Sequence, residues 1–219
     1  MSDVLSRLAE VRERIANAAR AAGREPRDVQ LVAVSKEASI DAVRDAITAG
    51  QRDFGENRAQ ELAAKAAGIA DAAPAWHFIG RLQRNKVKQI AGVVTLWQSV
   101  DRRDLGELIA RHAPGARVLV QVHLGEEDTK GGCDPAGAGA LTDRLAELGL
   151  AVEGLMTIPP QHEDPRPYFA RLRELAAQLG LHTLSMGMSG DYEAAIGEGA
   201  TLVRVGTAVF GARPPAARP

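Results

Sequence analysis

One lysine of this sequence stands where an amine could do chemistry. The chain has five lysines, and Lys36 is the one that directly follows a short apolar run, residues 31–35. It would then lie at the end of a strand, where a partly desolvated lysine loses its proton more readily than one in water. The neutral amine condenses with an aldehyde, which an arginine cannot do. The alternative is a structural lysine that caps carbonyl groups or pairs with Glu37.

Two glycine-containing turns late in the sequence could bind a phosphate. Ser189 and Gly190 lie in SMGMSGDYEAA, and Gly206 and Thr207 lie in RVGTAVFGAR. Both turns follow the segments that are predicted to be the last two strands. Glycine turns expose backbone amides and hydroxyl groups add donors, so the two pairs together suit a phosphate dianion. The alternative is two ordinary tight turns.

Two further polar residues lie at or near predicted strand ends. Asn57 follows the segment FGE, and Arg204 lies two residues before Gly206. Because side chains alternate along a strand, Arg204 and Gly206 face the same side. If that side is the interior, Arg204 must find a partner there. The alternative is an outward Arg204 that meets a carboxylate on a helix.

The elements that must position these residues are strands that alternate with helices. Eight short segments are predicted to be strands: LVAVS from Leu31, RDFG from Arg52, WHFIG from Trp76, LWQSV from Leu96, VLVQVHL from Val118, EGLMT from Glu153, TLSMG from Thr183 and LVRVG from Leu202. Strands that alternate with helices imply a parallel sheet covered on both faces. The sequence therefore predicts an α/β fold, a (β/α)8 TIM-type barrel with an additional N-terminal helix, whose functional groups lie at the carboxyl ends of the strands. An open doubly wound sheet is the alternative, but no glycine-rich turn follows the first strand.

The helices between the strands have recognisable ends and inner faces. Ser39 and Asp101 are predicted to cap two of them. After Ser39, the spacing of Ile40, Val43 and Ile47 predicts that all three side chains face inward.

Composition limits the class of partner. The chain has 219 residues, 45% of them hydrophobic, and a formal net charge of -1. This balance gives no net field to attract nucleic acid or an anionic membrane, and the apolar runs are far shorter than the roughly 20 residues of a membrane-spanning helix. A lone cysteine, Cys133, and an N-terminal segment with charges at Asp3 and Glu10 favour a cytoplasmic protein. We expect one domain, residues 1–213, a disordered tail at 214–219, a monomer, and no metal site.

Five segments resemble one known family. They are LVAVSK, FGENRAQE, WHFIGRLQRNK, GLMTIPP and SMGMSGDYEAAIGEGATLVRVGTAVFGAR. They resemble the pyridoxal phosphate homeostasis protein family, single-domain barrels related to the N-terminal domain of alanine racemase. The resemblance runs from the first helix to Arg213.

The resemblance implies a cofactor and its contacts. Lys36 would hold pyridoxal 5'-phosphate (PLP) as an internal aldimine. Asn57 would lie by the ring hydroxyl, Arg204 would face the pyridine nitrogen, and Met156 would approach the ring. Glu37 departs from the family, where a smaller or neutral residue is expected.

The phosphate of the cofactor has its own set of implied contacts. Ser189, Gly206 and Thr207 would hold the phosphate, and Gly190 would also bind the cofactor. Arg58 is a second departure from the family, because an aromatic residue is frequent after GEN.

A protonated arginine at the pyridine nitrogen disfavours carbanion chemistry, because it cannot give the ring the proton that makes it a strong electron sink. The two tyrosines, Tyr168 and Tyr192, are interpreted as packing and helix-start residues, so no second acid-base group is evident. The expected function is non-catalytic: binding PLP for storage, buffering and delivery to apo-enzymes. The alternatives are a racemase-type PLP enzyme acting on amino acids and a Schiff-base aldolase acting on a sugar phosphate.

The remaining polar residues carry weaker expectations. His77 and His123 are predicted to be hydrogen-bonded strand histidines. A basic run after the third strand is interpreted as a solvated helix face; it comprises Arg81, Arg84, Lys86 and Lys88. Lys130 is the candidate residue if the cofactor leaves Lys36 before release.

Overall fold

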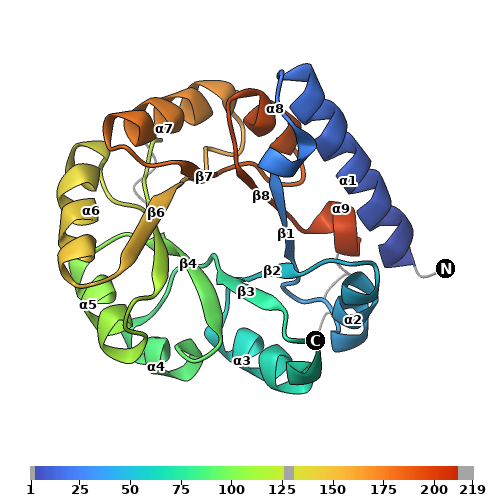
Figure 1. The fold of residues 1–219 in the computed structure, drawn as a ribbon, viewed down its shortest axis with the longest axis horizontal. Coiled ribbons are helices and arrows are strands. Elements are labelled where there is room, and N and C mark those ends of the chain that lie inside the picture. Colours follow the sequence, from blue (N-terminus) through green and yellow to red (C-terminus); the bar gives the residue numbers. More distant parts are fainter. Residues whose placement is uncertain (1–2, 126–130, 212–219) are drawn as a thin grey trace.

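The strands form a closed barrel. The structure is a computed structural model that describes residues 3–125 and 131–211. Eight parallel strands follow one another around the barrel, and β1 closes it by pairing with β8 (Figure 1). The strands are β1 (Gln30–Val34), β2 (Asp53–Glu56), β3 (Ala75–Phe78), β4 (Val94–Val100), β5 (Arg117–Gln121), β6 (Ala151–Met156), β7 (Thr183–Ser185) and β8 (Leu202–Val205). The predicted (β/α)8 barrel and its eight strands are confirmed.

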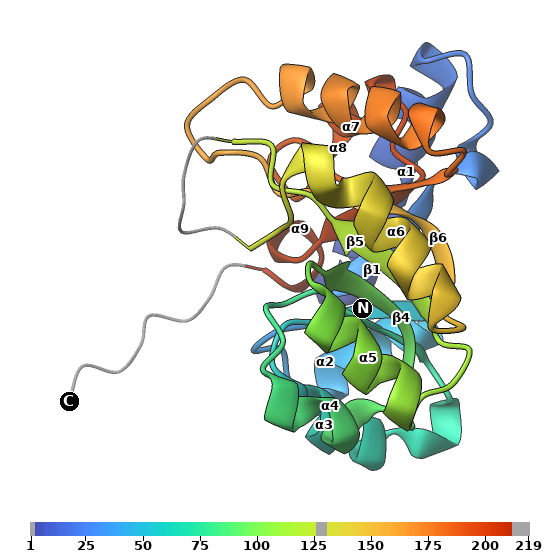
Figure 2. The same cartoon turned by 90° about the vertical axis from the view of Figure 1, so that its left-hand side faces the viewer.

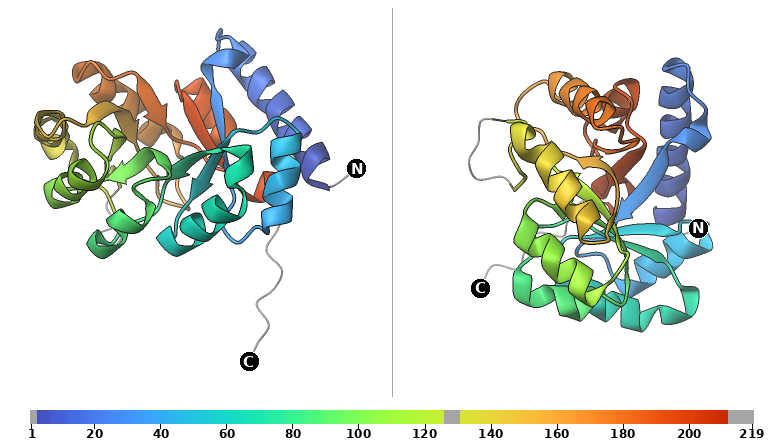
Figure 3. Two further views of the ribbon diagram at one scale, coloured as in Figure 1. Left: turned by 60° about the horizontal axis from the view of Figure 1, so that its bottom comes forward. Right: turned by 60° about the vertical axis from the view of Figure 1, so that its left-hand side comes forward.

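Helices form the outer layer around the strands, as the views in Figures 2 and 3 show. The α-helices of the described residues are α1 (Asp3–Ala21), α2 (Ile40–Thr48), α3 (Ala59–Gly68), α4 (Val87–Ile90), α5 (Arg103–His112), α6 (Ala138–Glu147), α7 (Arg166–Gln178), α8 (Tyr192–Gly197) and α9 (Thr207–Phe210). The described residues also form four short 3-10 turns in the connections between strands and helices: η1 (Pro26–Asp28), η2 (Ala70–Ala72), η3 (Arg84–Lys86) and η4 (Pro135–Gly137). The additional helix α1 packs against α8 and α9.

The barrel has two apolar layers. The larger one lies between strands and helices and includes Phe54, Trp97 and Phe169. The smaller cluster draws side chains from five different strands: Val32, Leu96, Leu119, Met156 and Leu202. Side chains of five strands can meet only inside the barrel, so this cluster marks the interior face of each strand.

Two local predictions for the helices are wrong. Asp101 does not cap α5, because that helix starts after Arg102 and the Asp101 carboxylate instead accepts a hydrogen bond from Arg102 Nη1 at 2.6 Å. Ile40 does not face inward: it is 37% exposed, because it occupies the first turn of α2 beyond the buried Val43. The Ser39 cap is confirmed by its hydroxyl, which accepts from the Ala42 amide at 3.1 Å.

Three expectations fall on residues that the structure does not describe. The tail at 214–219, the domain end at 213 and Lys130 lie outside the described residues. Across 3–125 and 131–211, no helix is both long enough and apolar enough to span a bilayer. The same residues include no cluster of histidine, cysteine and carboxylate side chains suited to a metal ion.

Candidate functional site

A cavity of about 480 Å³ opens at the carboxyl ends of the strands. This volume is within the range of small-molecule sites. Seven of the eight residues predicted from the sequence line it: Lys36, Asn57, Ser189, Gly190, Arg204, Gly206 and Thr207. The turns that follow strands β1, β2, β7 and β8 therefore meet at one place, as the barrel topology predicts.

Lys36 lines the cavity and is exposed there, so it is more open to solvent than the partly desolvated lysine expected from the sequence. The backbone on both sides of it is held in place. The Ser35 carbonyl accepts a hydrogen bond from Lys65 Nζ at 2.5 Å, and the Glu37 amide donates to Glu61 Oε1 at 2.5 Å. Glu37 has a φ of 64°, a left-handed conformation that a non-glycine residue rarely adopts. These contacts fix the direction of the chain at Lys36.

A buried ion-pair cluster supplies those two contacts. Besides its bonds to Ser35 and Glu61, Lys65 Nζ donates to Glu56 Oε1 at 2.8 Å, so all three ammonium protons have acceptors. The side chains of Lys65 and Glu56 are 6% and 0% exposed. Burial raises the pKa of Glu56, while hydrogen bonds from Lys65 and the Ser35 hydroxyl oppose that rise. The cluster ties β1, β2 and α3 together beneath Lys36.

Asn57 lines the cavity and carries an unsatisfied acceptor. Its Oδ1 is buried and has no hydrogen-bond partner among the described residues. The neighbouring wall is tight, because a Cβ at Gly80 would lie 2.2 Å from the Asn57 carbonyl oxygen. The Ser99 hydroxyl donates to the Gly80 carbonyl at 2.6 Å and so helps to keep the Gly80 backbone close to that of Asn57. Position 80 therefore requires glycine.

The two glycine turns are joined to each other. The Gly206 amide donates to the Ser189 hydroxyl at 3.2 Å, which connects the turn after β8 to the turn after β7. The Asp191 carboxylate accepts from the Met188 amide at 2.5 Å and stabilises the first turn. Ser189, Gly190, Gly206 and Thr207 thus form one edge of the cavity. The sequence argument that paired these turns is supported by this contact.

Arg204 faces the barrel interior, so the alternative of an outward arginine is wrong. It is 3% exposed, and its Nη1 and Nη2 donate to the Ser185 hydroxyl at 2.6 Å and the Thr157 carbonyl at 2.8 Å. Burial lowers the pKa of Arg204 to about 10, so it stays protonated at neutral pH. Among the described residues, no carboxylate lies within ion-pair distance of its guanidinium, and Nε has no hydrogen-bond partner. The Nε–H is therefore available to a ligand.

The structure does not bring Met156 to the cavity wall. Its side chain is fully buried in the interior apolar cluster, and Ile158, two residues further on, lines the cavity. The shift follows from the strand period: Met156 is the last residue of β6 and points into the barrel below the opening.

Sequence reasoning missed several lining residues. Ile79, Gly80 and Arg81 follow β3, and Gln121 ends β5. Arg81 was expected on a solvated helix face, but it precedes η3 and contributes to the cavity. Its place directly after the WHFIG segment is the signal that could have found it.

Neither tyrosine lines this cavity. Tyr168 donates to Glu163 at the surface. Tyr192 is buried and lies under the guanidinium of Arg14 from α1, 5.4 Å from the ring centre. His77 is confirmed as a buried, hydrogen-bonded strand histidine, whereas His123 follows β5 and its buried Nε2 has no partner among the described residues.

The chain is similar to known proteins in both sequence and fold. The family model described as alanine racemase, N-terminal domain, matches residues 6–214. A protein of Pseudomonas aeruginosa named pyridoxal phosphate homeostasis protein is 48% identical, with 97% of each chain covered, and one of Aquifex aeolicus with the same name is 44% identical, covering 94% of this chain and 97% of the relative. The solved structure of PipY from Synechococcus elongatus with PLP bound superposes with a TM-score of 0.84 at 37% identity, covering 95% of this chain and all of that one. Identity at this level over nearly the whole length shows that the chain belongs to the pyridoxal phosphate homeostasis protein family.

Proposed function

We propose that this protein binds PLP in the cavity at the carboxyl end of the barrel and takes part in PLP homeostasis, without catalysing a reaction. The observation that carries the proposal is that one cavity is lined by the Lys36 amine and by the joined turns of Ser189 and Gly206. The names of the relatives and the PLP-bound structure of PipY support the choice of ligand.

The donors and acceptors around the cavity fit PLP. The Ser189 and Thr207 hydroxyls, with glycine amides beside them, suit a phosphate. The unpaired Oδ1 of Asn57 suits a hydroxyl donor such as the one on the ring. When bound, the cofactor supplies an aldehyde that condenses with a neutral amine and a pyridine ring that can withdraw electrons.

The residues around the cavity would have distinct roles toward the bound cofactor. Lys36 would hold the aldehyde carbon covalently, while Ser35 and Glu37 hold the direction of Lys36 through their backbone contacts. Arg204 only donates hydrogen bonds, so it would keep the ring nitrogen that faces it unprotonated. In that form the ring withdraws electrons weakly, and carbanion chemistry is disfavoured.

A racemase-type reaction also needs an acid-base group on the other side of the substrate. Neither tyrosine is among the residues that line the cavity. Nothing in the comparisons favours this alternative or the sugar-phosphate aldolase, since the curated relatives are named for PLP homeostasis.

The finer parts of the proposal concern setting and partners. We infer storage, buffering and delivery to PLP-dependent apo-enzymes as the homeostatic role, a cytoplasmic location, and a monomer. The single half-buried cysteine, Cys133, supports a reducing compartment. Sedimentation of the purified chain at several concentrations tests the monomer.

The decisive experiment is a titration of the purified protein with PLP. We expect a visible absorption band that borohydride bleaches. Peptide mass spectrometry of the borohydride-reduced protein should then find the cofactor attached to Lys36. Lys36→Ala should abolish the band, while Lys88→Ala, at an exposed lysine outside the cavity, should keep it. A wild-type protein with neither a band nor equilibrium binding refutes the proposal. Release of the α-proton of amino acids into heavy water at a useful turnover would refute its non-catalytic part.

A further inference from the structure

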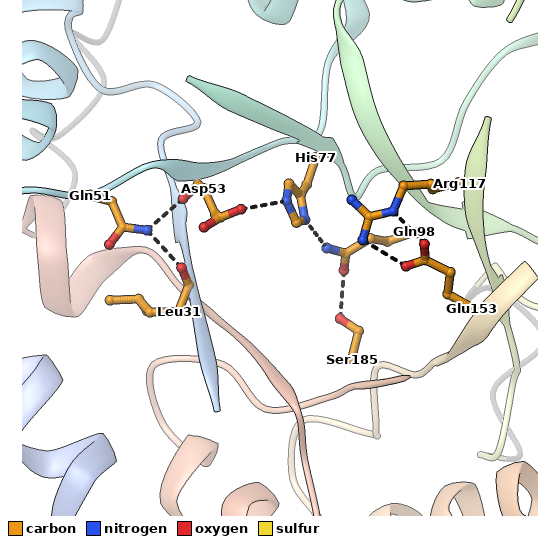
Figure 4. A network of polar contacts seen from close by, with 8 residues as sticks. All are labelled: Leu31, Gln51, Asp53, His77, Gln98, Arg117, Glu153 and Ser185. Carbon is orange, nitrogen blue, oxygen red and sulfur yellow. Dashed lines mark hydrogen bonds and ion pairs between the residues drawn. The ribbon is translucent and has the colours of Figure 1, made fainter. Parts of the chain in front are cut away.

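A line of polar side chains runs through the barrel interior from Arg204 at the cavity to Asp53 at the opposite mouth; Figure 4 shows its part from Ser185 to Asp53. Arg204 at the cavity contacts Ser185 at 2.6 Å, and the Ser185 hydroxyl contacts Gln98 Oε1 at 2.6 Å. Gln98 Nε2 lies 2.7 Å from His77 Nδ1, and His77 Nε2 lies 3.2 Å from Asp53 Oδ1. The four residues from Arg204 to His77 are each at most 4% exposed. We call these five residues the polar chain.

The hydrogen bonds of the polar chain run in one direction from its cavity end. Arg204 can only donate, so the Ser185 oxygen accepts from it, and the Ser185 hydroxyl in turn donates to Gln98 Oε1. The amide of Gln98 therefore presents its NH₂ group to His77, whose Nδ1 must accept. The ring proton is then on Nε2 and donates to Asp53. Arg204 and Asp53 are the positive and negative ends of one directed chain.

A protonated His77 does not fit this arrangement. Both of its ring nitrogens would donate, so the amide of Gln98 would have to turn over. The NH₂ group of Gln98 would then face Ser185, whose oxygen already accepts from Arg204 and whose proton would lose its acceptor. The polar chain thus links the charge state of His77 to the hydrogen bonds of Arg204.

Other charges face His77 across a cavity of about 220 Å³ at the amino end of the barrel. Arg27 and Asp28 come from η1, Arg117 from β5 and Glu153 from β6. Arg117 donates to Glu153 through Nη2 at 2.9 Å, so these two largely compensate each other (Figure 4). Asp53 remains the carboxylate in contact with the ring, and its bond from His77 lowers its pKa against the effect of burial.

Arg204 depends on the polar chain because its charge is buried without an ion pair. Among the described residues, its hydrogen-bond acceptors are the neutral Ser185 hydroxyl and the Thr157 carbonyl. A buried charge is costly unless polar groups are oriented toward it. Gln98 orients Ser185, and His77 with Asp53 orients Gln98, so the acceptor facing Arg204 is fixed before a ligand arrives.

We propose that Asp53, His77, Gln98 and Ser185 are positioning residues that hold Arg204 as a charged donor toward the cavity and so set, from the far end of the barrel, the electronic state of the bound cofactor. This inference rests on the proposed function. These polar residues lie within the strands, and they would affect ligand binding through Arg204 rather than by touching the ligand.

The first test uses the protein without cofactor. Nitrogen-15 NMR of the histidine side chains should show His77 neutral, with its proton on Nε2, at pH 7. In Gln98→Glu the new carboxylate still accepts from Ser185 but also accepts from His77, so His77 should become doubly protonated at pH 7. Wild-type His77 with its proton on Nδ1, or charged at pH 7, would overturn the proposal whatever the protein binds.

The second test measures PLP binding by equilibrium titration and by the pH dependence of the visible band. Gln98→Leu and Ser185→Ala, each of which interrupts the polar chain, should weaken binding by about 10-fold or more, the effect of one charge-assisted hydrogen bond. Ser185→Ala removes a single oxygen, so it keeps the test available if Gln98→Leu folds poorly. Both variants should also shift the pH profile of the band.

The matched control is Gln51→Leu. Gln51 is also a buried glutamine at the amino end of the barrel, where its Nε2 donates to the Leu31 and Asp53 carbonyls, but it is not part of the polar chain (Figure 4). Its loss should lower thermal stability and leave the band and the affinity unchanged. If Gln98→Leu and Ser185→Ala behave like Gln51→Leu, the positioning role is refuted while the proposed function stands. If the wild type binds no PLP, the proposed function fails instead.

Discussion

Replacing Lys65 by methionine should destabilise the barrel strongly, although Lys65 lies outside the cavity. The substitution keeps most of the side-chain volume and removes the three hydrogen bonds of Nζ to Ser35, Glu56 and Glu61. The Glu56 carboxylate, which is 0% exposed and already has an unpaired Oε2, then becomes a buried charge without a counter-ion.

The size of the effect follows from that burial. Removing one partner of a buried pair costs about 3–5 kcal/mol, because the remaining charge stays desolvated. Against a total of about 5–15 kcal/mol for a domain, this is a large fraction. With a urea dependence of about 2–3 kcal/mol per molar, the midpoint of urea unfolding should fall by more than about 1 M.

The same perturbation has a pH dependence with a definite sign. Burial raises the pKa of Glu56, and loss of Lys65 removes the hydrogen bond that opposes this rise. A carboxyl whose native pKa lies above its unfolded value stabilises the fold below the unfolded pKa and loses that contribution as the pH rises through the native pKa. The deficit of Lys65→Met relative to the wild type should therefore shrink when the pH is lowered from 7 toward 5.

Two variants complete the experiment. Lys65→Met with Glu56→Gln removes both charges and should recover at least half of the lost free energy of unfolding. Lys88→Met, at an exposed lysine, should change it by no more than about 0.5 kcal/mol. A loss below about 1 kcal/mol in Lys65→Met, or a double variant no more stable than the single one, would refute the reasoning.

Three further outcomes can be measured independently. A Cβ at Gly154 would lie 1.9 Å from the Thr183 carbonyl oxygen, so Gly154→Ala should lower the free energy of unfolding by at least about 2 kcal/mol, while Gly137→Ala, where nothing lies within 4 Å, should change it by less than about 0.5. Burial raises the pKa of the Cys133 thiol to about 11, so iodoacetamide at pH 8 should react with it roughly 100-fold more slowly than with an exposed cysteine; equal rates would contradict this. Ala73 has a φ of 43°, so Ala73→Gly should stabilise the fold by up to about 1 kcal/mol in urea unfolding, and a loss of stability would count against the strain.

The barrel could be predicted from the sequence because its strands and helices are punctuated clearly. Runs such as residues 31–34 and 118–120 are apolar on both faces, as strands covered by helices require. Gly149 and Gly180 follow α6 and α7 with φ of 78° and 66°, the left-handed conformation in which glycine commonly ends a helix. The wrong details, Asp101 and Ile40, lie at helix starts, where one residue of displacement changes both cap and face.

The cavity was also largely predictable, since the topology alone brings the carboxyl ends of parallel strands together. Lys36, Asn57 and Gly206 were found by that rule. The exposure of Lys36 could not be predicted, because it depends on how far the surrounding loops extend over the opening. The Lys65 cluster was also missed, since a lysine within a helix pattern gives no sign of which carboxylates lie beneath it.

The partners of Arg204 are the part that sequence pattern could not supply, and the reason is register. Alternation along β8 showed only that Arg204 and Gly206 share a face. Pairing of Arg204 with Val32 of β1, an interior residue, decides that the face is the inner one. Ser185 and Gln98 then meet across the barrel although 87 residues separate them. In the sequence of each of these strands, the polar residue stands beside apolar ones and alone resembles a defect in the pattern. Only the strand register of the closed barrel shows that these polar residues form hydrogen bonds with one another. It also shows that Arg204 connects this interior network to the cavity.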